Sequence, residues 1–257
     1  MENTGIHRAK TWQMALFALN NTSTNLWLVL LNFVAYYLTG YVGVAVVMAT
    51  SVMTFMRIWD AITDPIVGYI VDKTDGKFGK NRPFMAAGNL VLVITTFLMF
   101  FTTHELPEQY RFIYFLVIYL IYIIGYTLQT VVTKSAQSCL TNDPKQRPTF
   151  GIYDGIYNAV LMALLPGYVA QTLVPKFGGF TVGLFQELWM FVAPLSILFT
   201  WLAIFALKDK DRTEFFGTGE PVKVTFKDYW DVLKNNRAIQ MLVVSASTDK
   251  LAALVTT

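Results

Sequence analysis

Two aspartates, Asp60 and Asp64, lie four residues apart inside an apolar run, and Arg57 lies three residues before the first of them. Helical periodicity places all three side chains on one face of a membrane helix. A carboxylate at the centre of a bilayer costs about 2.5–3.5 kcal/mol on insertion scales. Two carboxylates on adjacent turns also repel each other, and a bound cation or a proton relieves that repulsion. The pattern therefore predicts a coupling-ion site for Na⁺ or H⁺ at Asp60 and Asp64.

A structural ion pair between Arg57 and Asp60 is the alternative explanation for those two residues. It does not account for Asp64. Catalytic chemistry has no support, because His7 and His104 fall in terminal or loop positions without partner residues, and the single cysteine lacks the partners of a zinc site. We therefore expect neither enzyme activity nor a cofactor.

The composition indicates a membrane protein. The 257 residues are 54% hydrophobic and 14% charged, with a mean hydropathy of +0.46, whereas soluble domains average about 25% charged residues. The net charge of +3 is small, so nucleic acid is not expected as a partner. About 20 mostly apolar residues cross a bilayer, and only a helix satisfies its own backbone polar groups there. Six stretches qualify, and a seventh begins near Ala238: Met14–Leu38, Gly43–Val71, Pro83–Thr103, Phe112–Gln137, Phe150–Val174 and Leu184–Leu207.

The basic residues predict the orientation of these spans. With the amino terminus inside, fifteen of the 20 Lys and Arg residues fall on the cytoplasmic side, and two, Arg111 and Lys176, fall in the outer loops. This asymmetry follows the positive-inside rule. We therefore expect an all-α, multi-pass plasma-membrane protein with a cytoplasmic amino terminus.

Polar residues concentrate in spans one, four and seven, a period of three. They are Asn20 to Asn25 in the first span, Gln129, Thr130, Thr133, Lys134 and Gln137 in the fourth, and Ser245 to Lys250 in the seventh. Spans three and six are almost purely apolar and are expected to face lipid. Hydrogen bonding between helices explains any single amide or hydroxyl, but it does not explain the period or the lysine. Repeated three-helix units around a wet cavity, typical of secondary transporters, explain both.

The polar stretch after span six is expected to link two halves of a transporter. Within it, four apolar residues fall on one helical stripe and predict a short amphipathic helix on the cytoplasmic membrane face, with a solvated linker as the alternative. These residues are Phe226, Tyr229, Trp230 and Leu233. The predicted domains are a six-helix bundle (1–207), a cytoplasmic linker (208–237) and the start of a second bundle (238–257).

The run RIWDAITDPIVGYIVDKTDGKFGKNRP, residues 57–83, resembles the signature of the glycoside–pentoside–hexuronide:cation symporters. This melibiose permease-like family belongs to the major facilitator superfamily. The matching positions are Asp60, Asp64, Pro65, Gly68, Asp72, Thr74, Gly79, Lys80, Arg82 and Pro83. The resemblance implies the amino-terminal six-helix bundle of a protein of about twelve spans, plus the start of helix seven. The missing carboxyl-terminal half is then a partner of this one.

The resemblance also implies roles for individual residues. Asp60 and Asp64 belong to the Na⁺/H⁺/Li⁺ site and are the candidate Na⁺ ligands, with Thr130 on helix four as a further cation-binding candidate. Sugar binds between the two halves. A cytoplasmic latch holds the halves in one conformation, and its residues are Gly68, Asp72, Lys80 and Arg82.

The family's sugar-binding residues do not carry over to this chain. Where the family has acidic residues on helices one and four, the chain has Thr24 and Thr130, and Lys134 replaces an aromatic residue. A buried lysine can bind a substrate carboxylate, such as that of a hexuronide, or pair with Asp154 or Asp64 in the empty protein. The candidate substrate-binding residues are Thr24, Asn25, Tyr126, Lys134 and Asp154.

The leading hypothesis is a secondary active transporter that couples Na⁺ or H⁺ to symport of a sugar, glycoside or hexuronide by alternating access. A carrier of lysolipid-like amphiphiles with the same fold is the alternative within transport. A non-transporting membrane sensor or scaffold is the third hypothesis, and the costly carboxylates Asp60 and Asp64 argue against it. The expected location is the bacterial inner membrane, and the expected partners are lipid, a monovalent cation and a small sugar.

Overall fold

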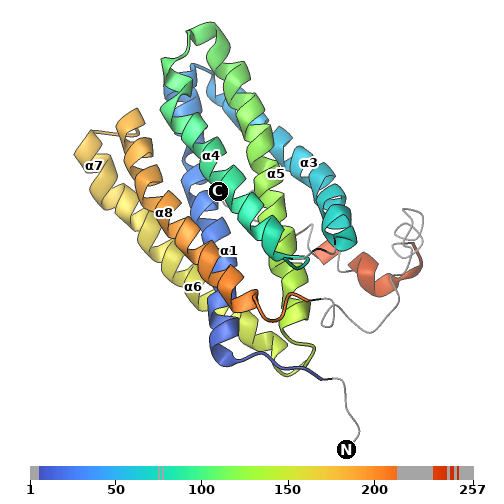
Figure 1. The fold of residues 1–257 in the computed structure, drawn as a ribbon. Coiled ribbons are helices and arrows are strands. Elements are labelled where there is room, and N and C mark those ends of the chain that lie inside the picture. The colour runs from blue at the N-terminus through green and yellow to red at the C-terminus, as the bar shows by residue number, and fades with distance from the viewer. Residues whose placement is uncertain are drawn as a thin grey trace, which may run out of the picture. The chain divides into compact units, whose positions relative to one another are not determined.

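A computed structural model of the chain describes residues 6–74, 76, 78–212, 234–241, 244–245 and 248. The chain divides into two compact units, Met1–Gly217 and Thr218–Thr257. Every regular element in the described residues of the first unit is a helix (Figure 1). In chain order these are α1 (Thr11–Asn32), α2 (Val34–Tyr37), η1 (Leu38–Val42), α3 (Val46–Lys73), α4 (Arg82–Phe101), η2 (Thr103–Glu105), α5 (Glu108–Leu140), α6 (Arg147–Tyr168), η3 (Val169–Leu173), α7 (Val174–Phe177) and α8 (Val182–Leu207).

Six helical segments of the first unit are long and apolar enough to cross a membrane. They are Thr11–Val42, Val46–Lys73, Arg82–Glu105, Glu108–Leu140, Arg147–Phe177 and Val182–Leu207. Each overlaps one of the six stretches predicted from hydropathy, so the predicted fold class is confirmed. Of the described residues in the second unit, 234–235, 237–241, 244–245 and 248 are helical. The predicted amphipathic stripe at 226–233 lies outside the described residues, as do Asp249 and Lys250 in the predicted seventh span.

Glycine and proline set several ends of these spans. Gly43 (φ 83°) ends the first span and Gly178 (φ 69°) ends the fifth, both in the left-handed conformation that glycine adopts without strain. Pro83 and Pro148 lie in the first turns of α4 and α6. A missing N–H leaves no hydrogen bond unmade there.

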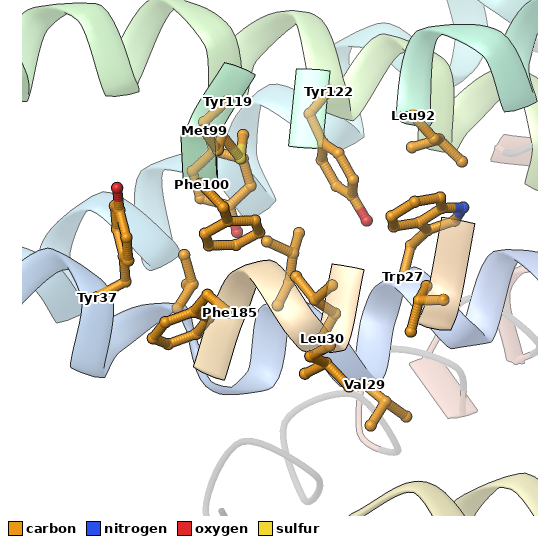
Figure 2. Packing of buried hydrophobic residues seen from close by; sticks show 14 of the residues in the cluster. Trp27, Val29, Leu30, Tyr37, Leu92, Met99, Phe100, Tyr119, Tyr122 and Phe185 are labelled. Carbon is orange, nitrogen blue, oxygen red and sulfur yellow. The ribbon is translucent and has the colours of Figure 1, made fainter. Parts of the chain in front are cut away.

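The core of the first unit lies among α1, α4, α5 and α8. Figure 2 shows Trp27, Leu30, Phe100, Tyr122 and Phe185 from these helices pointing into one cluster, and all five are fully buried. The rings of Phe100 and Phe185 stack with their centroids 5.1 Å apart. In the spans containing α3 and α6, 22% of the apolar window is buried, against 50% in those of α1 and α5. The second and fifth spans therefore leave most of their surface uncovered in this unit.

A hydrogen-bonded cluster of buried polar side chains lies where α1, α4 and α8 meet. The hydroxyl of Ser196 accepts hydrogen bonds from Trp27 Nε1 at 2.7 Å and from Asn89 Nδ2 at 2.6 Å, and it lies 2.9 Å from Ser23 Oγ. Ser23 Oγ in turn lies 2.9 Å from Thr200 Oγ1. Spans three and six, predicted to be almost purely apolar, thus contribute polar groups to the interior, while their exposed side chains are mostly apolar.

Replacing Ser196 with alanine is expected to lower the free energy of unfolding by about 1–3 kcal/mol, because Trp27 and Asn89 lose their shared acceptor in an apolar core. Thermal unfolding of the purified protein in detergent measures the change. Ser51→Ala is the matched control, since Ser51 is exposed on α3 and its hydroxyl donates only to Val47 O of the same helix. We expect less than about 0.5 kcal/mol from the control. Equal losses in the two variants would contradict the role given to the cluster.

Candidate cation and sugar site

Asp60 connects α3 to α5. Its Oδ1 accepts a hydrogen bond from Thr127 Oγ1 at 3.1 Å, and the hydroxyl of Thr63 lies 3.2 Å from that of Thr127. Thr63 Oγ1 also lies 3.1 Å from the Asp60 carbonyl oxygen within α3. Hard cations favour carboxylate, hydroxyl and carbonyl oxygens. Asp60, Thr63 and Thr127 therefore offer oxygen ligands from two spans close to one another.

Asp64 lies one turn further along α3 and is half-buried, as is Asp60. Tyr126 of α5 lies close enough to Asp60, Arg57 and Asp64 to interact with all three electrostatically. Arg57 is exposed, and within the described ranges no ion pair of 4.0 Å or less joins it to Asp60. The structural ion pair considered as the alternative for these two residues is therefore not formed. The two aspartates instead share their surroundings with Tyr126 and Thr127.

Thr127 and Thr63 are not among the site residues predicted from the sequence. The predicted residue, Thr130, lies one turn later on α5, and its hydroxyl donates to Thr127 O of its own helix at 3.1 Å. The available signal was helical spacing, since Thr127 precedes Thr130 by three residues on the same face. Deciding between them requires the rotation of α5 against α3, which hydropathy does not determine.

Two substrate candidates lie apart from this cluster. Thr24 is 1% exposed, and its hydroxyl donates to Asn20 O of α1 at 3.0 Å. Lys134, predicted from the sequence to be buried, is exposed on α5. No ion pair joins Lys134 to Asp154 in the part of the chain that the structure describes. The internal pair expected for the empty protein is therefore not formed with Asp154.

The remaining substrate candidates, Asp154 and Asn25, lie between α1 and α6. Asn21 Nδ2 donates a hydrogen bond to Asp154 Oδ1 at 2.7 Å, and Asn25 Nδ2 donates to Asn158 Oδ1 at 2.7 Å. All four side chains are half-buried. The structure therefore gives the predicted polar residues two locations, one between α3 and α5 and one between α1 and α6.

Away from the ends of the six described spans, the ionisable side chains sum to one negative charge when all of them are ionised. Arg57 and Lys134 supply two positive charges, and Asp60, Asp64 and Asp154 supply three negative ones. A net charge inside a membrane is costly.

At the end of the bundle predicted to be cytoplasmic, the latch candidates form an ion pair and a capped helix start. Lys80 Nζ lies 2.7 Å from Asp72 Oδ1. Asp211, which follows α8 and is fully buried, accepts hydrogen bonds from the backbone N–H groups of Asn81 and Arg82 at 3.0 and 2.9 Å. Arg82 Nε lies 3.5 Å from the same carboxylate. The first N–H groups of a helix have no partner within it, so Asp211 completes the start of α4.

Of two glycines in the signature, Gly79 could not be replaced by a residue with a side chain without a collision, whereas Gly68 could. Gly79 has a φ of 90°, and a Cβ at that position would collide with the carboxylate of Asp211. A Cβ at Gly68 would meet nothing within 4 Å. Among the described residues of the first unit, no other helix therefore approaches Gly68 closely.

The amino-terminal segment is bound to the loop between α5 and α6. Arg8 Nε lies 2.6 Å from Asp143 Oδ2, and the backbone N–H of Ala9 donates to Gln146 Oε1 at 3.0 Å. The hydrogen bond from the backbone N–H of Lys145, followed by that from Arg8, holds the pKa of Asp143 below its usual value. This carboxylate is therefore charged at neutral pH, where it fixes the chain just before α1.

The chain is similar to known membrane proteins of one family. The profile of the family described as MFS/sugar transport protein matches residues 21–257. YnaJ of Bacillus subtilis, named an uncharacterized symporter, is 27% identical over 220 residues, which are 82% of this chain and 45% of that protein. YagG of Escherichia coli, named as a candidate glycoside/cation symporter, is 31% identical over 121 residues, or 47% of this chain and 26% of that protein. The glucuronide carrier protein homolog of Escherichia coli is 25% identical over 141 residues, or 55% of this chain and 31% of that protein.

Six helices long and apolar enough to cross a membrane bring carboxylates, amides and hydroxyls of different spans together, an arrangement typical of secondary transporters. The chain belongs to the MFS/sugar transport protein family, whose profile covers residues 21–257. The resemblance to the glycoside–pentoside–hexuronide:cation symporters is thereby confirmed, and the protein is a multi-pass membrane protein. The chain spans less than half the length of the three relatives named above.

Proposed function

We propose that the protein is a cation-coupled symporter that moves a sugar, glycoside or hexuronide by alternating access. The observation that carries the proposal is the hydrogen bond from Thr127 of α5 to Asp60 of α3, with Asp64 one turn away. It places carboxylate and hydroxyl oxygens from two spans together inside the membrane. The ion is Na⁺ or H⁺, and the other half of the relatives' length completes the cavity.

Coupling follows from the charge of the site. With no ion bound, the middle of the spans carries one net negative charge, and closing two halves around it removes that charge from water at a high cost. A bound cation, or a proton on Asp60 or Asp64, cancels the charge and lowers that cost. A ligand shifts a conformational equilibrium only as far as its affinities for the two states differ. Closing the two halves is therefore more favourable for the protein with the ion bound than for the empty protein.

We assign a conformational latch to Gly68, Asp72, Lys80 and Arg82. These residues lie at the same end of the bundle as the amino terminus, which is the predicted cytoplasmic side. Three observations support it. The side chain of Asp72 is 63% exposed despite its contact with Lys80, so part of the carboxylate is open to a partner element. Arg82 is held at the start of α4 by the buried carboxylate of Asp211. The surroundings of Gly68 are open, which leaves room for a helix of the other half.

Uptake into proteoliposomes tests the symport, with protein that spans the full length of the relatives. Labelled glycosides, pentosides and glucuronides are supplied under an imposed Na⁺ gradient and then under a pH gradient. We expect at least one sugar to accumulate under one gradient, and Asp64→Asn to reduce the gradient-driven part at least about tenfold, a loss of about 1.4 kcal/mol in ion binding. If Asp64→Asn does not reduce sugar accumulation, the two aspartates have a structural role and do not bind the coupling ion. Uptake of lysolipids and of no sugar would favour the amphiphile carrier.

A further inference from the structure

Two polar pairs connect α1 and α6 as consecutive rungs. Asn21 and Asn25 lie one turn apart on α1, and their partners Asp154 and Asn158 lie one turn apart on α6, with both hydrogen bonds 2.7 Å long. The rungs differ in one atom type, because the first ends in a carboxylate and the second in an amide. The chain thus presents a charged and a neutral form of the same contact side by side.

The rungs are more exposed than the polar cluster around Ser196. The cluster around Ser196 is buried, whereas all four rung side chains are half-exposed. Each rung residue also has a second polar atom that makes no further hydrogen bond within the described ranges. Hydrocarbon cannot satisfy such atoms, so they require water or a polar ligand beside them. The rungs therefore line a wet surface inside the membrane.

The rung atoms that make no further hydrogen bond indicate which chemical groups a ligand should present. Asn21 Oδ1 and Asp154 Oδ2 accept hydrogen bonds, and the Asn25–Asn158 rung retains one carbonyl and one NH₂ group whichever way its amides are assigned. Acceptors thus predominate, and one of them is charged. Hydroxyl groups, which donate, fit this surface. A carboxylate, which only accepts, meets charge repulsion at Asp154.

Two tyrosines of α6 adjoin the rung residues in the sequence. Tyr153 and Tyr157 directly precede Asp154 and Asn158, and their ring centroids are 6.1 Å apart. Both rings are half-buried. A sugar ring presents hydroxyls at its edge and C–H groups on its face. The amides and carboxylate therefore match the edge, and the tyrosine rings match the face.

We propose that the Asn21–Asp154 and Asn25–Asn158 rungs form the subsite that binds the hydroxyl groups of a neutral sugar and discriminates against hexuronides. The inference rests on the proposed symport and narrows its substrate class from the three chemistries that the family covers. Asp154 is the specificity-determining residue, since its charge separates a neutral glycoside from its uronide. The competing assignment gives a substrate carboxylate to the exposed Lys134 and predicts the opposite preference.

Binding of matched ligands tests the subsite independently of transport. Phenyl β-glucoside and phenyl β-glucuronide differ only at C6, as do the corresponding galactoside and galacturonide, and phenyl β-xyloside lacks C6. Calorimetric titration of full-length protein with each probe, at saturating Na⁺ and again at low pH, gives the ratio of neutral to anionic affinity. We expect the unmodified protein to bind a neutral probe at least about tenfold more tightly than its uronide, a difference of about 1.4 kcal/mol.

Two substitutions exchange the chemistry of the rungs without removing either contact. Asp154→Asn converts the first rung into the Asn–Asn pair seen one turn away, and we expect the neutral-to-anionic ratio to fall to about threefold or less. Asn158→Asp converts the second rung into the Asn–Asp pair, and we expect that ratio to rise above that of the unmodified protein. Both keep side-chain volume and a possible hydrogen bond, so a purely structural contact would leave the ratio unchanged.

Three results would overturn the inference. They are a preference of the unmodified protein for the uronides, a ratio that neither substitution changes, and an effect of Asp154→Asn on the affinity for Na⁺ or H⁺ in place of the sugar ratio. Any of them can occur with gradient-driven sugar uptake intact, in which case only the subsite fails. If no sugar binds and none accumulates under either gradient, the symport proposal fails together with the subsite.

Discussion

Replacing Asp60 with asparagine is expected to abolish cation-activated uptake, with a rate about 100-fold lower at the cation concentration that half-activates the unmodified protein. The substitution removes the charged oxygen that accepts the hydrogen bond from Thr127 and places an amide in the proposed cation site. A 100-fold loss corresponds to about 2.7 kcal/mol of ion binding. Initial uptake rates of full-length protein in proteoliposomes, titrated with Na⁺ and then with pH, measure it.

Two threonines one turn apart on α5 supply the matched controls. Thr127→Val removes the hydroxyl bonded to Asp60, and the loss of a hydrogen bond to a charged group, about 1.5 kcal/mol, should weaken cation activation about tenfold. Thr130 bonds its own helix, so Thr130→Val should change activation less than about twofold. Equal losses from both valine variants, or full cation activation of Asp60→Asn, would show that the cation does not bind at the contact between α3 and α5.

The spans were predictable from the sequence because bilayer physics acts on each segment separately. A run of about 20 apolar residues must satisfy its own backbone, whatever its neighbours do. The stretch Phe112–Gln137 therefore predicts the middle of α5 correctly, and the structure extends it to Glu108–Leu140. The ends extend further because polar residues continue the helix beyond the apolar run. Hydropathy does not register those turns.

The contacts between spans were only partly predictable. Asp60 and Asp64 are visible because two charges in an apolar run are rare, whereas Thr127 resembles any other hydroxyl in span four until α3 is packed against it. The contact between Asn89 and Ser196 was not predictable for the same reason. The role of a single polar residue in an apolar span depends on its partner in another helix. Long-range pairing of this kind depends on helix rotation, which single-span periodicity leaves undetermined.

Asp211 was hidden by its sequence context. It belongs to the run KDKDR at residues 208–212, where charged residues are expected to be solvated. The structure instead buries it fully against the start of α4, while Asp209, two residues earlier, is exposed. Nothing in the local pattern distinguishes the two aspartates, because the distinction comes from the N–H groups of residues 80–82.

Replacing Asp211 with alanine is expected to produce the largest loss of stability in the first unit, about 3 kcal/mol. The substitution leaves the N–H groups of Lys80, Asn81 and Arg82 without their acceptor at a helix start and removes the carboxylate beside the Arg82 guanidinium. A loss of this size lowers the midpoint of thermal unfolding by about 6–12 °C for a unit of this length. Thermal unfolding of the purified protein in detergent, followed by circular dichroism, measures the shift.

The charge and the hydrogen bonds of Asp211 are separable. Asp211→Asn keeps an oxygen acceptor for the N–H groups of α4 and loses only the charge, so we expect about 1–2 kcal/mol, between the effect of alanine and none. Asp209→Ala removes an exposed carboxylate from the same run and should shift stability by less than about 0.5 kcal/mol. An Asp209→Ala loss that matches Asp211→Ala would show that the run stabilises the unit through its net charge and not through the start of α4.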